Sequence, residues 1–257
     1  MNAHRSRWLG RRYLCEVGGH RVPSFAAMLY LGSVAGIAAG AIAAQAGGMS
    51  AQRFAAAAMV LLIPALVGAR LWFVLQNAAS FRLRGQRIFR PLDAGAAQDG
   101  GLVLCVIASI PILELLDLPF RMFWDNATLT LLVGAAVTRV GCLMNGCCAG
   151  RPTEGLLAAL LPNHRGEWRH RYPTPLLEAI LALALLAGAL FARSTQPPNG
   201  IIFASALMLH AVGRALIALT RETGDRRRML RISFGMNSLF VLAAVAMLWR
   251  AVPASSL

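Results

Sequence analysis

The sequence predicts an all-α, polytopic membrane protein with about seven transmembrane helices and two surface arm segments. The first observation is composition: 57% of the 257 residues are hydrophobic, only 14% are charged, and the mean hydropathy is +0.59. Such values lie outside the range of a soluble domain. The second is that the apolar residues gather in stretches of roughly 20, the length that crosses a bilayer.

Seven apolar stretches are expected to span the membrane, each bounded by arginine, proline or glycine. They are residues 24–47, 54–76, 100–118, 127–146, 175–193, 200–220 and 232–250. We therefore expect one seven-helix transmembrane domain over 24–250. It would be flanked by a basic N-terminal tail, 1–23, and a C-terminal tail, 251–257, with the surface arms at 77–99 and 147–174.

The strong positive charge of the chain comes from arginine, without any lysine. The sequence has 25 arginines, no lysine and a formal net charge of +14. Most of these arginines lie in short loops between apolar stretches, a position that favours anionic lipid headgroups as partners. We therefore expect contact with membrane lipids and no nucleic-acid partner.

Three arginines, Arg70, Arg139 and Arg214, lie inside predicted spans. An ionised guanidinium at bilayer depth is costly, so such residues usually face a cavity or an anionic partner. Together they predict an intramembrane site for a negatively charged ligand.

The densest motif follows Arg139. Arg139, Asn145, Gly141 and Gly146 can approach one another at the end of the fourth span. A guanidinium forms forked hydrogen bonds to phosphate oxygens, and an asparagine amide adds a donor and an acceptor. This combination suits a phosphate ester.

A simpler interpretation of the same motif remains open. Gly141 and Gly146 would be packing glycines, and Arg139 would pair with an intramembrane acid such as Asp125 or Glu114.

Cys142, Cys147 and Cys148 place three sulfurs within seven residues, a set that could bind zinc. The paired C-x-x-C spacing of zinc sites is missing, however, and no histidine follows at ligand distance. A thiolate nucleophile is conceivable because arginines nearby lower a thiol pKa. Small buried cysteines that pack are the favoured interpretation, and neither a metal nor an organic cofactor is expected.

Six short motifs follow one another in order between about residue 20 and residue 225. They are Leu66–Leu75 around Arg70, Gly100-Gly101-Leu102, Asp125, Thr138–Gly146, Arg171–Glu178, and Arg214 with Arg221. In this order they resemble the bacterial prolipoprotein diacylglyceryl transferase family. Thr138–Gly146 is similar to its Gly-Arg-Ile-Gly-Asn-Phe-Ile-Asn-Gly run, and Arg171–Glu178 to its Arg-His-Pro-Ser-Gln-Leu-Tyr-Glu.

The resemblance implies an inner-membrane enzyme of lipoprotein maturation. Such an enzyme moves the diacylglyceryl group of phosphatidylglycerol to the lipobox cysteine thiol of a preprolipoprotein and releases glycerol phosphate. It must neutralise charge on the leaving group and deprotonate the thiol. Arg139 and Arg214 fit the first requirement. The expected substrate-binding residues are Asn145, Gly141, Gly146, Gly100, Gly101, Arg70, Glu178 and Arg221.

The chain departs from the family pattern at four positions. Asp99 stands where the family has a histidine, and His210 stands where it has a tyrosine. We hypothesise that His210 is the general base and that Asp99 fixes its tautomer or stabilises its cation. A hydrogen-bonded packing histidine is the alternative. Cys142 replaces an asparagine and Cys147 an acidic residue.

Two predictors of orientation disagree. With seven spans, 18 arginines fall on the side of the N-terminus and four on the other. The positive-inside rule would place the arginine-rich side in the cytoplasm. The resemblance implies the opposite, with the N-terminus and a periplasmic catalytic face outside, and we follow the resemblance.

Two other classes of function stay open. A divergent paralogue would bind an anionic lipid without transferring its diacylglyceryl group. An anion transporter would also place arginines within its spans.

Overall fold

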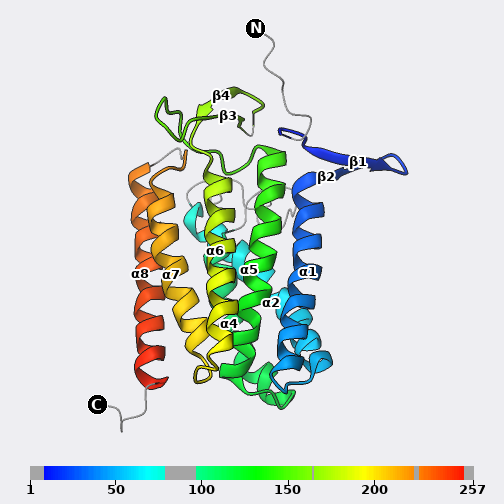
Figure 1. Ribbon diagram of the computed structural model, residues 1–257. Helices are drawn as coiled ribbons and strands as arrows, with labels where there is room; N and C mark the ends of the chain where they lie inside the picture. Colours follow the sequence, from blue (N-terminus) through cyan, green and yellow to red (C-terminus); the bar gives the residue numbers. More distant parts are fainter. Residues whose placement is uncertain (1–8, 79–96, 164, 223–225, 252–257) are drawn as a thin grey trace. The chain divides into compact units, whose positions relative to one another are not determined.

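The computed structural model describes residues 9–78, 97–163, 165–222 and 226–251. Seven of its helices are long and apolar enough to cross a membrane, which confirms the all-α, multi-pass fold (Figure 1). They are α1 (Ser24–Ala46), α2 (Ala51–Gln76), α4 (Gln98–Leu115), α5 (Phe120–Asn145), α6 (Thr174–Ser194), α7 (Ile201–Ala218) and α8 (Arg226–Ala251).

Two helices begin earlier than the sequence predicts. α5 begins at Phe120 instead of residue 127, and α8 begins at Arg226 instead of residue 232. In both cases charged residues, such as Arg121 and Arg231, lower the local hydropathy but continue the helix. Hydropathy therefore locates the apolar part of each helix and misses its polar first turns.

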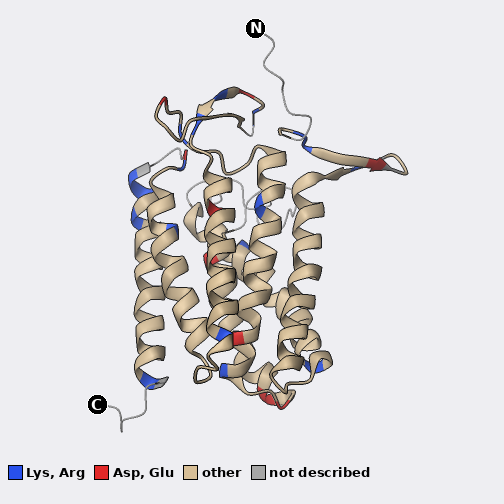
Figure 2. Ribbon diagram, viewed as in Figure 1, with Lys and Arg blue, Asp and Glu red and all other residues tan. Residues whose placement is uncertain are grey.

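The outer faces of the helices are apolar. Val34 on α1, Ile63 on α2, Leu183 on α6, Leu216 on α7 and Leu242 on α8 are all exposed. Figure 2 shows uncharged residues along most of the length of these helices. Because a helix satisfies its own backbone groups, a helix with such a surface is stable against lipid.

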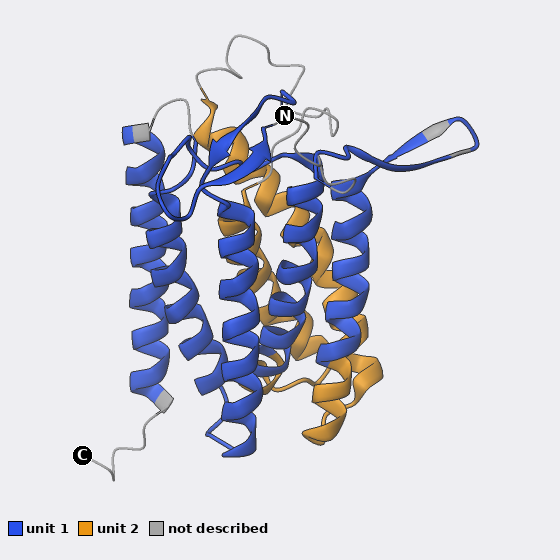
Figure 3. Cartoon of the chain, turned by 45° about the horizontal axis from the view of Figure 1, so that its top comes forward, with its two compact units in different colours: residues 1–40, 124–257 blue, residues 41–123 orange. Residues whose placement is uncertain are grey.

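The chain forms two compact units, residues 41–123 and residues 1–40 with 124–257 (Figure 3). In the unit of residues 41–123, α2 and α4 pack closely through glycines. A Cβ at Gly101 would lie 2.7 Å from the carbonyl oxygen of Ala65, and a Cβ at Gly68 would meet the backbone of Gly100. Small residues thus allow these two helices to approach.

In the unit of residues 1–40 and 124–257, α1 and α5 pack through a similar stripe of small residues. A Cβ at Gly32 would lie 2.8 Å from the carbonyl oxygen of Gly134. Near the start of α5, the ring of Trp124 packs on Phe203 of α7, with 4.8 Å between centroids. α5 therefore contacts both α1 and α7.

Two β-hairpins occur where the sequence analysis expected a tail and an arm. β1 (Tyr13–Val17) pairs with β2 (His20–Pro23), and β3 (Ala159–Pro162) pairs with β4 (Trp168–Arg171), both antiparallel. Gly18 and Gly19 form the first turn with φ of 56° and 79°, which a two-residue hairpin turn requires. Figure 1 shows both hairpins and the start of α8 at the same end of the larger unit.

The predicted arm at 77–99 lies almost entirely outside the described residues. The division into a tail, one transmembrane domain and two arms stays a prediction.

Candidate functional site: a buried arginine–glutamate cluster

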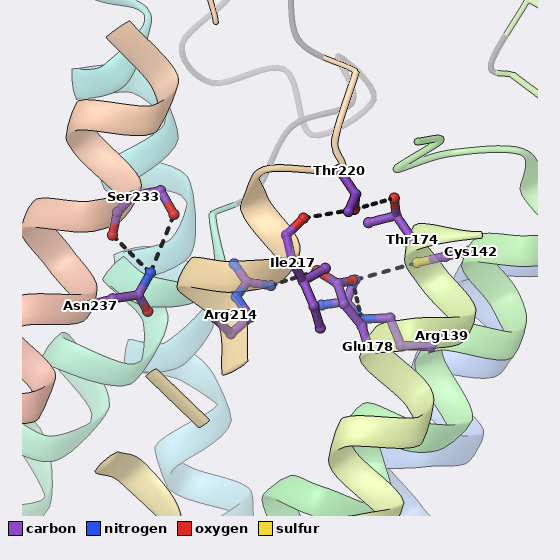
Figure 4. Close-up of polar contacts among 9 residues, drawn as sticks. All are labelled: Arg139, Cys142, Thr174, Glu178, Arg214, Ile217, Thr220, Ser233 and Asn237. Carbon is purple, nitrogen blue, oxygen red and sulfur yellow. Dashed lines mark hydrogen bonds and ion pairs between the residues drawn. The ribbon is translucent and has the colours of Figure 1, made fainter. Parts of the chain in front are cut away.

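Arg139, Glu178 and Arg214 form a charged cluster that joins three helices (Figure 4). Arg139 Nε lies 2.9 Å from Glu178 Oε2, and Arg214 Nη1 donates to Glu178 Oε1 at 3.1 Å. The Glu178 side chain is 4% exposed, and the two arginine side chains are 13% and 12% exposed. One carboxylate from α6 is thus held between guanidinium groups from α5 and α7.

Arg139 forms its ion pair with Glu178 and not with Asp125, which the sequence offered as an alternative partner. The carboxylate of Asp125 instead accepts the backbone N–H groups of Gly200 and Phe203, at 2.6 and 2.8 Å. The simpler interpretation was right that an acid pairs with Arg139, but the acid is Glu178.

Arg221 adds a third guanidinium beside the cluster. It follows the end of α7 and interacts electrostatically with Glu178, Arg139 and Cys148. Burial by itself lowers the pKa of Arg221, but the charges of Glu178 and Cys148 outweigh burial and raise this pKa overall. Arg221 therefore stays ionised, as its predicted binding role requires.

A cavity of about 50 Å³ opens beside Glu178 and Arg214. Its lining residues come from α6, α7, α8 and the segment after α7: Glu178, Arg214, Ala218, Arg221, Met229, Leu230 and Ser233. The side chain of Asn237, one turn along α8, donates to the carbonyl oxygen of Ser233 at 2.8 Å and to its Oγ at 3.3 Å.

Sequence reasoning missed Ser233 and Asn237. They are two polar residues four positions apart in an apolar stretch, a spacing that places them on one face of a helix. That pattern is the feature of the sequence from which a polar helix face could have been predicted here.

The arm after α5 is bonded to the end of α7. Arg171 of β4 is 1% exposed and pairs with Glu222 Oε2 at 2.5 Å. The backbone N–H of Arg151 donates to the carbonyl oxygen of Thr220 at 2.8 Å, and the hydroxyls of Thr174 and Thr220 lie 3.0 Å apart (Figure 4). These bonds hold the backbone next to Arg221. From the sequence, Arg171 was identified only as part of the Arg171–Glu178 motif, without this structural role.

His210 lies one turn before Arg214 on α7. Its Nδ1 is buried and has no hydrogen-bond partner among the described residues. Asp99 lies in the first turn of α4, in the other compact unit. Their pairing stays a prediction.

Three other predicted binding residues also lie in the smaller unit. Gly100 and Gly101 are buried where α4 packs on α2, and a Cβ at Gly100 would meet the side chain of Trp72. The guanidinium of Arg70 lies 5.8 Å from the centre of the Phe73 ring. Packing accounts for the two glycines, and a substrate-binding role for all three residues stays a prediction.

The remaining predicted binding residues surround the end of α5. A Cβ at Gly141 would lie 2.7 Å from Met28 Cβ of α1, and Gly146 has a φ of 68° and approaches the carbonyl oxygen of Asn163. Asn145 ends α5, and its side chain interacts with Cys147. Both glycines therefore have packing or turn roles, and their contact with a substrate stays a prediction.

The sequence places three cysteines within seven residues, and the structure brings their thiols together. The Sγ atoms of Cys142, Cys147 and Cys148 all lie within 4.8 Å of one another. The guanidinium of Arg139 lies beside them, with Nη1 3.7 Å from Cys142 Sγ.

Fold and site together define a multi-pass membrane protein with a buried, arginine-rich cluster beside a cavity. The family model described as prolipoprotein diacylglyceryl transferase matches residues 12–250. The chain belongs to that family.

Relatives named phosphatidylglycerol–prolipoprotein diacylglyceryl transferase include proteins from Halalkalibacterium halodurans and Geobacter sulfurreducens. The first is 25% identical over 251 residues, covering 93% of this chain and 85% of the relative. The second is 26% identical over 181 residues, covering 70% and 69%. A relative from Dehalococcoides mccartyi is 33% identical over 104 residues, covering 39% and 40%.

Proposed function

We propose that the protein transfers the diacylglyceryl group of phosphatidylglycerol to the lipobox cysteine thiol of a preprolipoprotein and releases glycerol phosphate. Family membership and the names of the relatives support this reaction. The observation that carries the proposal is the carboxylate of Glu178 held between Arg139 and Arg214 beside a cavity. Two guanidinium groups that hold two carboxylate oxygens can also hold two phosphate oxygens.

The charge of the cluster fits the leaving group. Arg139, Arg214 and Arg221 together with Glu178 carry a formal charge of +2, or +1 when the charge of an ionised Cys148 is included. The phosphodiester of phosphatidylglycerol carries one negative charge, and glycerol phosphate carries close to two. Charge therefore grows on the leaving group during the reaction, and preorganised guanidinium groups stabilise that growth most in a site that excludes water.

The reaction needs one bond to form and one to break. The lipobox sulfur attacks the glyceryl carbon that bears the phosphate, a C–S bond forms, and the C–O bond to phosphate breaks with both electrons passing to oxygen. The thiol proton goes to a general base, for which we propose His210. Its Nδ1 is buried one turn from Arg214 and is not engaged by another described residue.

The roles of His210 and Asp99 are tested by substitution. We expect His210→Ala to lower the transfer rate at least 100-fold, as is typical when a general base is lost. Asp99→Ala should lower it less, because Asp99 would act through the imidazole. Near-full transfer by both variants would eliminate the pair as acid–base machinery.

We also propose that the protein lies in the bacterial inner membrane with its catalytic face toward the periplasm. The two hairpins and the start of α8, which lie at one end of the larger unit, would then face the periplasm. Cys15 in β1 is exposed. An impermeant thiol reagent applied to intact cells should label Cys15 and not a cysteine added at the C-terminus. Labelling of the C-terminal cysteine alone would reverse the orientation.

The transferase activity itself is tested by mass spectrometry. Purified protein is incubated with phosphatidylglycerol and a lipobox peptide, beside a relative that is active under the same conditions. We expect the peptide to gain the mass of a diacylglyceryl group. If the peptide stays unmodified while phosphatidylglycerol still binds, the protein is a lipid-binding paralogue. Flux of an anionic solute into proteoliposomes without transfer would instead identify a transporter.

A further inference from the structure

The three thiols at the end of α5 are the strongest cluster of reactive side chains that the proposed reaction does not use. Cys142 is 1% exposed, whereas Cys147 and Cys148 are partly exposed. All three Sγ atoms lie within 4.8 Å of one another. Zinc–sulfur bonds of about 2.3 Å place the sulfurs of a tetrahedral site roughly 4 Å apart. Small side-chain movements would therefore let one metal ion touch all three.

The backbone turns sharply to bring these thiols together. α5 ends at Asn145, and Gly146 and Cys148 then adopt positive φ values of 68° and 57°. The left-handed conformation is uncommon for a residue with a side chain. This turn carries Cys147 and Cys148 back toward Cys142.

Two guanidinium groups lie beside the thiols. Arg139 Nη1 lies 3.7 Å from Cys142 Sγ, and Arg221 interacts electrostatically with Cys148. Two positive charges are therefore next to the three sulfur atoms.

The two arginines beside the thiols would stabilise a metal–thiolate complex. Three thiolates around a divalent ion give a complex with one net negative charge. Guanidinium N–H groups next to metal-bound sulfurs act as outer hydrogen-bond donors, and such donors stabilise the ligands and tune the metal. Arg139 and Arg221 already occupy these positions.

We propose that Cys142, Cys147 and Cys148 form a binding site for one soft, thiophilic metal ion of the Zn²⁺ class. The ion displaces the thiol protons and binds three sulfurs, leaving its fourth position to water or another ligand. Hard cations such as Ca²⁺ and Mg²⁺ prefer oxygen ligands, so the site discriminates against them. This inference does not depend on the transferase activity.

The site is tested by direct binding to the full-length protein in detergent. The protein is fully reduced, transferred under nitrogen into buffer without reductant, and titrated with Cd²⁺, whose thiolate complexes absorb in the near ultraviolet. We expect one equivalent to bind with a thiolate charge-transfer band, and Zn²⁺ to displace it. Ca²⁺ and Mg²⁺ should not compete.

Substitutions assign the ligands. Cys142→Ser, Cys147→Ser and Cys148→Ser should each weaken Cd²⁺ binding at least tenfold, while Cys15→Ser and Cys105→Ser bind as wild type. A fully reduced wild-type protein that shows no charge-transfer band would overturn the proposal. So would equal binding by wild type and the variant in which all three clustered cysteines are serine. Because the first outcome is measured on wild type, it holds even if a variant fails to fold.

Discussion

The helices α5, α6 and α7 carry two buried polar clusters, one toward each end, and the two differ in how their charge is satisfied. At one end, Asp125 accepts backbone N–H groups of Gly200 and Phe203, and Arg193 donates to Asn126 Oδ1 at 2.9 Å. At the other, Glu178 is shared by Arg139 and Arg214 (Figure 4).

The difference is the one we expect between a structural cluster and the proposed anion site. Asp125 caps the first turn of α7, where fixed backbone donors meet a negative charge. Glu178 has two guanidinium partners, a third arginine nearby and a cavity beside it. A polar cluster that stabilises the fold is neutralised by the protein itself. A cluster that binds an anion keeps an excess of positive charge next to open space.

The largest effect should come from removing either arginine of the Glu178 cluster. We expect Arg139→Ala and Arg214→Ala each to lower transfer to a lipobox peptide by about 100-fold or more, because each removes a charged donor from the leaving group. Lysine at either position should restore only part of the rate, because it keeps the positive charge but lacks the paired N–H donors of a guanidinium group. Initial rates with phosphatidylglycerol, measured by mass spectrometry, give the comparison.

Arg193→Ala is the matched control, because Arg193 contacts the opposite cluster. This variant should keep a rate within a few-fold of wild type. A loss as large as that of Arg139→Ala would show that the two clusters are not functionally distinct.

The next effect concerns the negative charge that the arginines share. Glu178→Gln leaves two buried guanidinium groups without their carboxylate, so we expect the melting temperature to fall by roughly 5–10 °C. An anionic lipid can replace the lost charge. Phosphatidylglycerol should therefore raise the melting temperature of the variant more than that of wild type.

Phosphatidylcholine serves as the zwitterionic control and should give no such recovery. Equal stabilisation by both lipids would contradict the assignment of this cluster as the anion site.

A smaller effect is expected at Asp125. Asp125→Ala removes the acceptor of two buried N–H groups, at a cost of about 2 kcal/mol, and should lower the melting temperature by about 5 °C. The transfer rate per folded molecule should stay near that of wild type. A variant that melts like wild type but has lost transfer would move Asp125 from the structural cluster to the functional one.

The sequence predicted the helices well because each follows from the residues of its own stretch. Continuous apolar stretches of span length are visible without knowing any contact, so all seven helices were found. Their polar first turns, at Phe120 and Arg226, were missed because hydropathy does not measure helix formation.

The site was predicted less completely because its pairings join distant parts of the chain. Arg139 and Arg214 were identifiable as charges in apolar stretches, and Glu178 entered through the family resemblance. That Glu178 bridges the two arginines, and that Cys148 turns back onto Cys142, depends on helix packing and on a left-handed backbone conformation. Neither has a signature in residue spacing.

The smallest effect tests the part of the cavity lining that comes from α8. Ser233 lines the cavity, and its Oγ accepts a hydrogen bond from Asn237, so its own hydroxyl proton is available to a ligand. We expect Ser233→Ala to raise the KM for phosphatidylglycerol about fivefold, the equivalent of one hydrogen bond of about 1 kcal/mol, with little change in kcat. Ser194→Ala, at an exposed position on α6, is the matched control. A fall in kcat without a change in KM would place Ser233 in contact with the leaving group during the reaction, which would extend the functional cluster to α8.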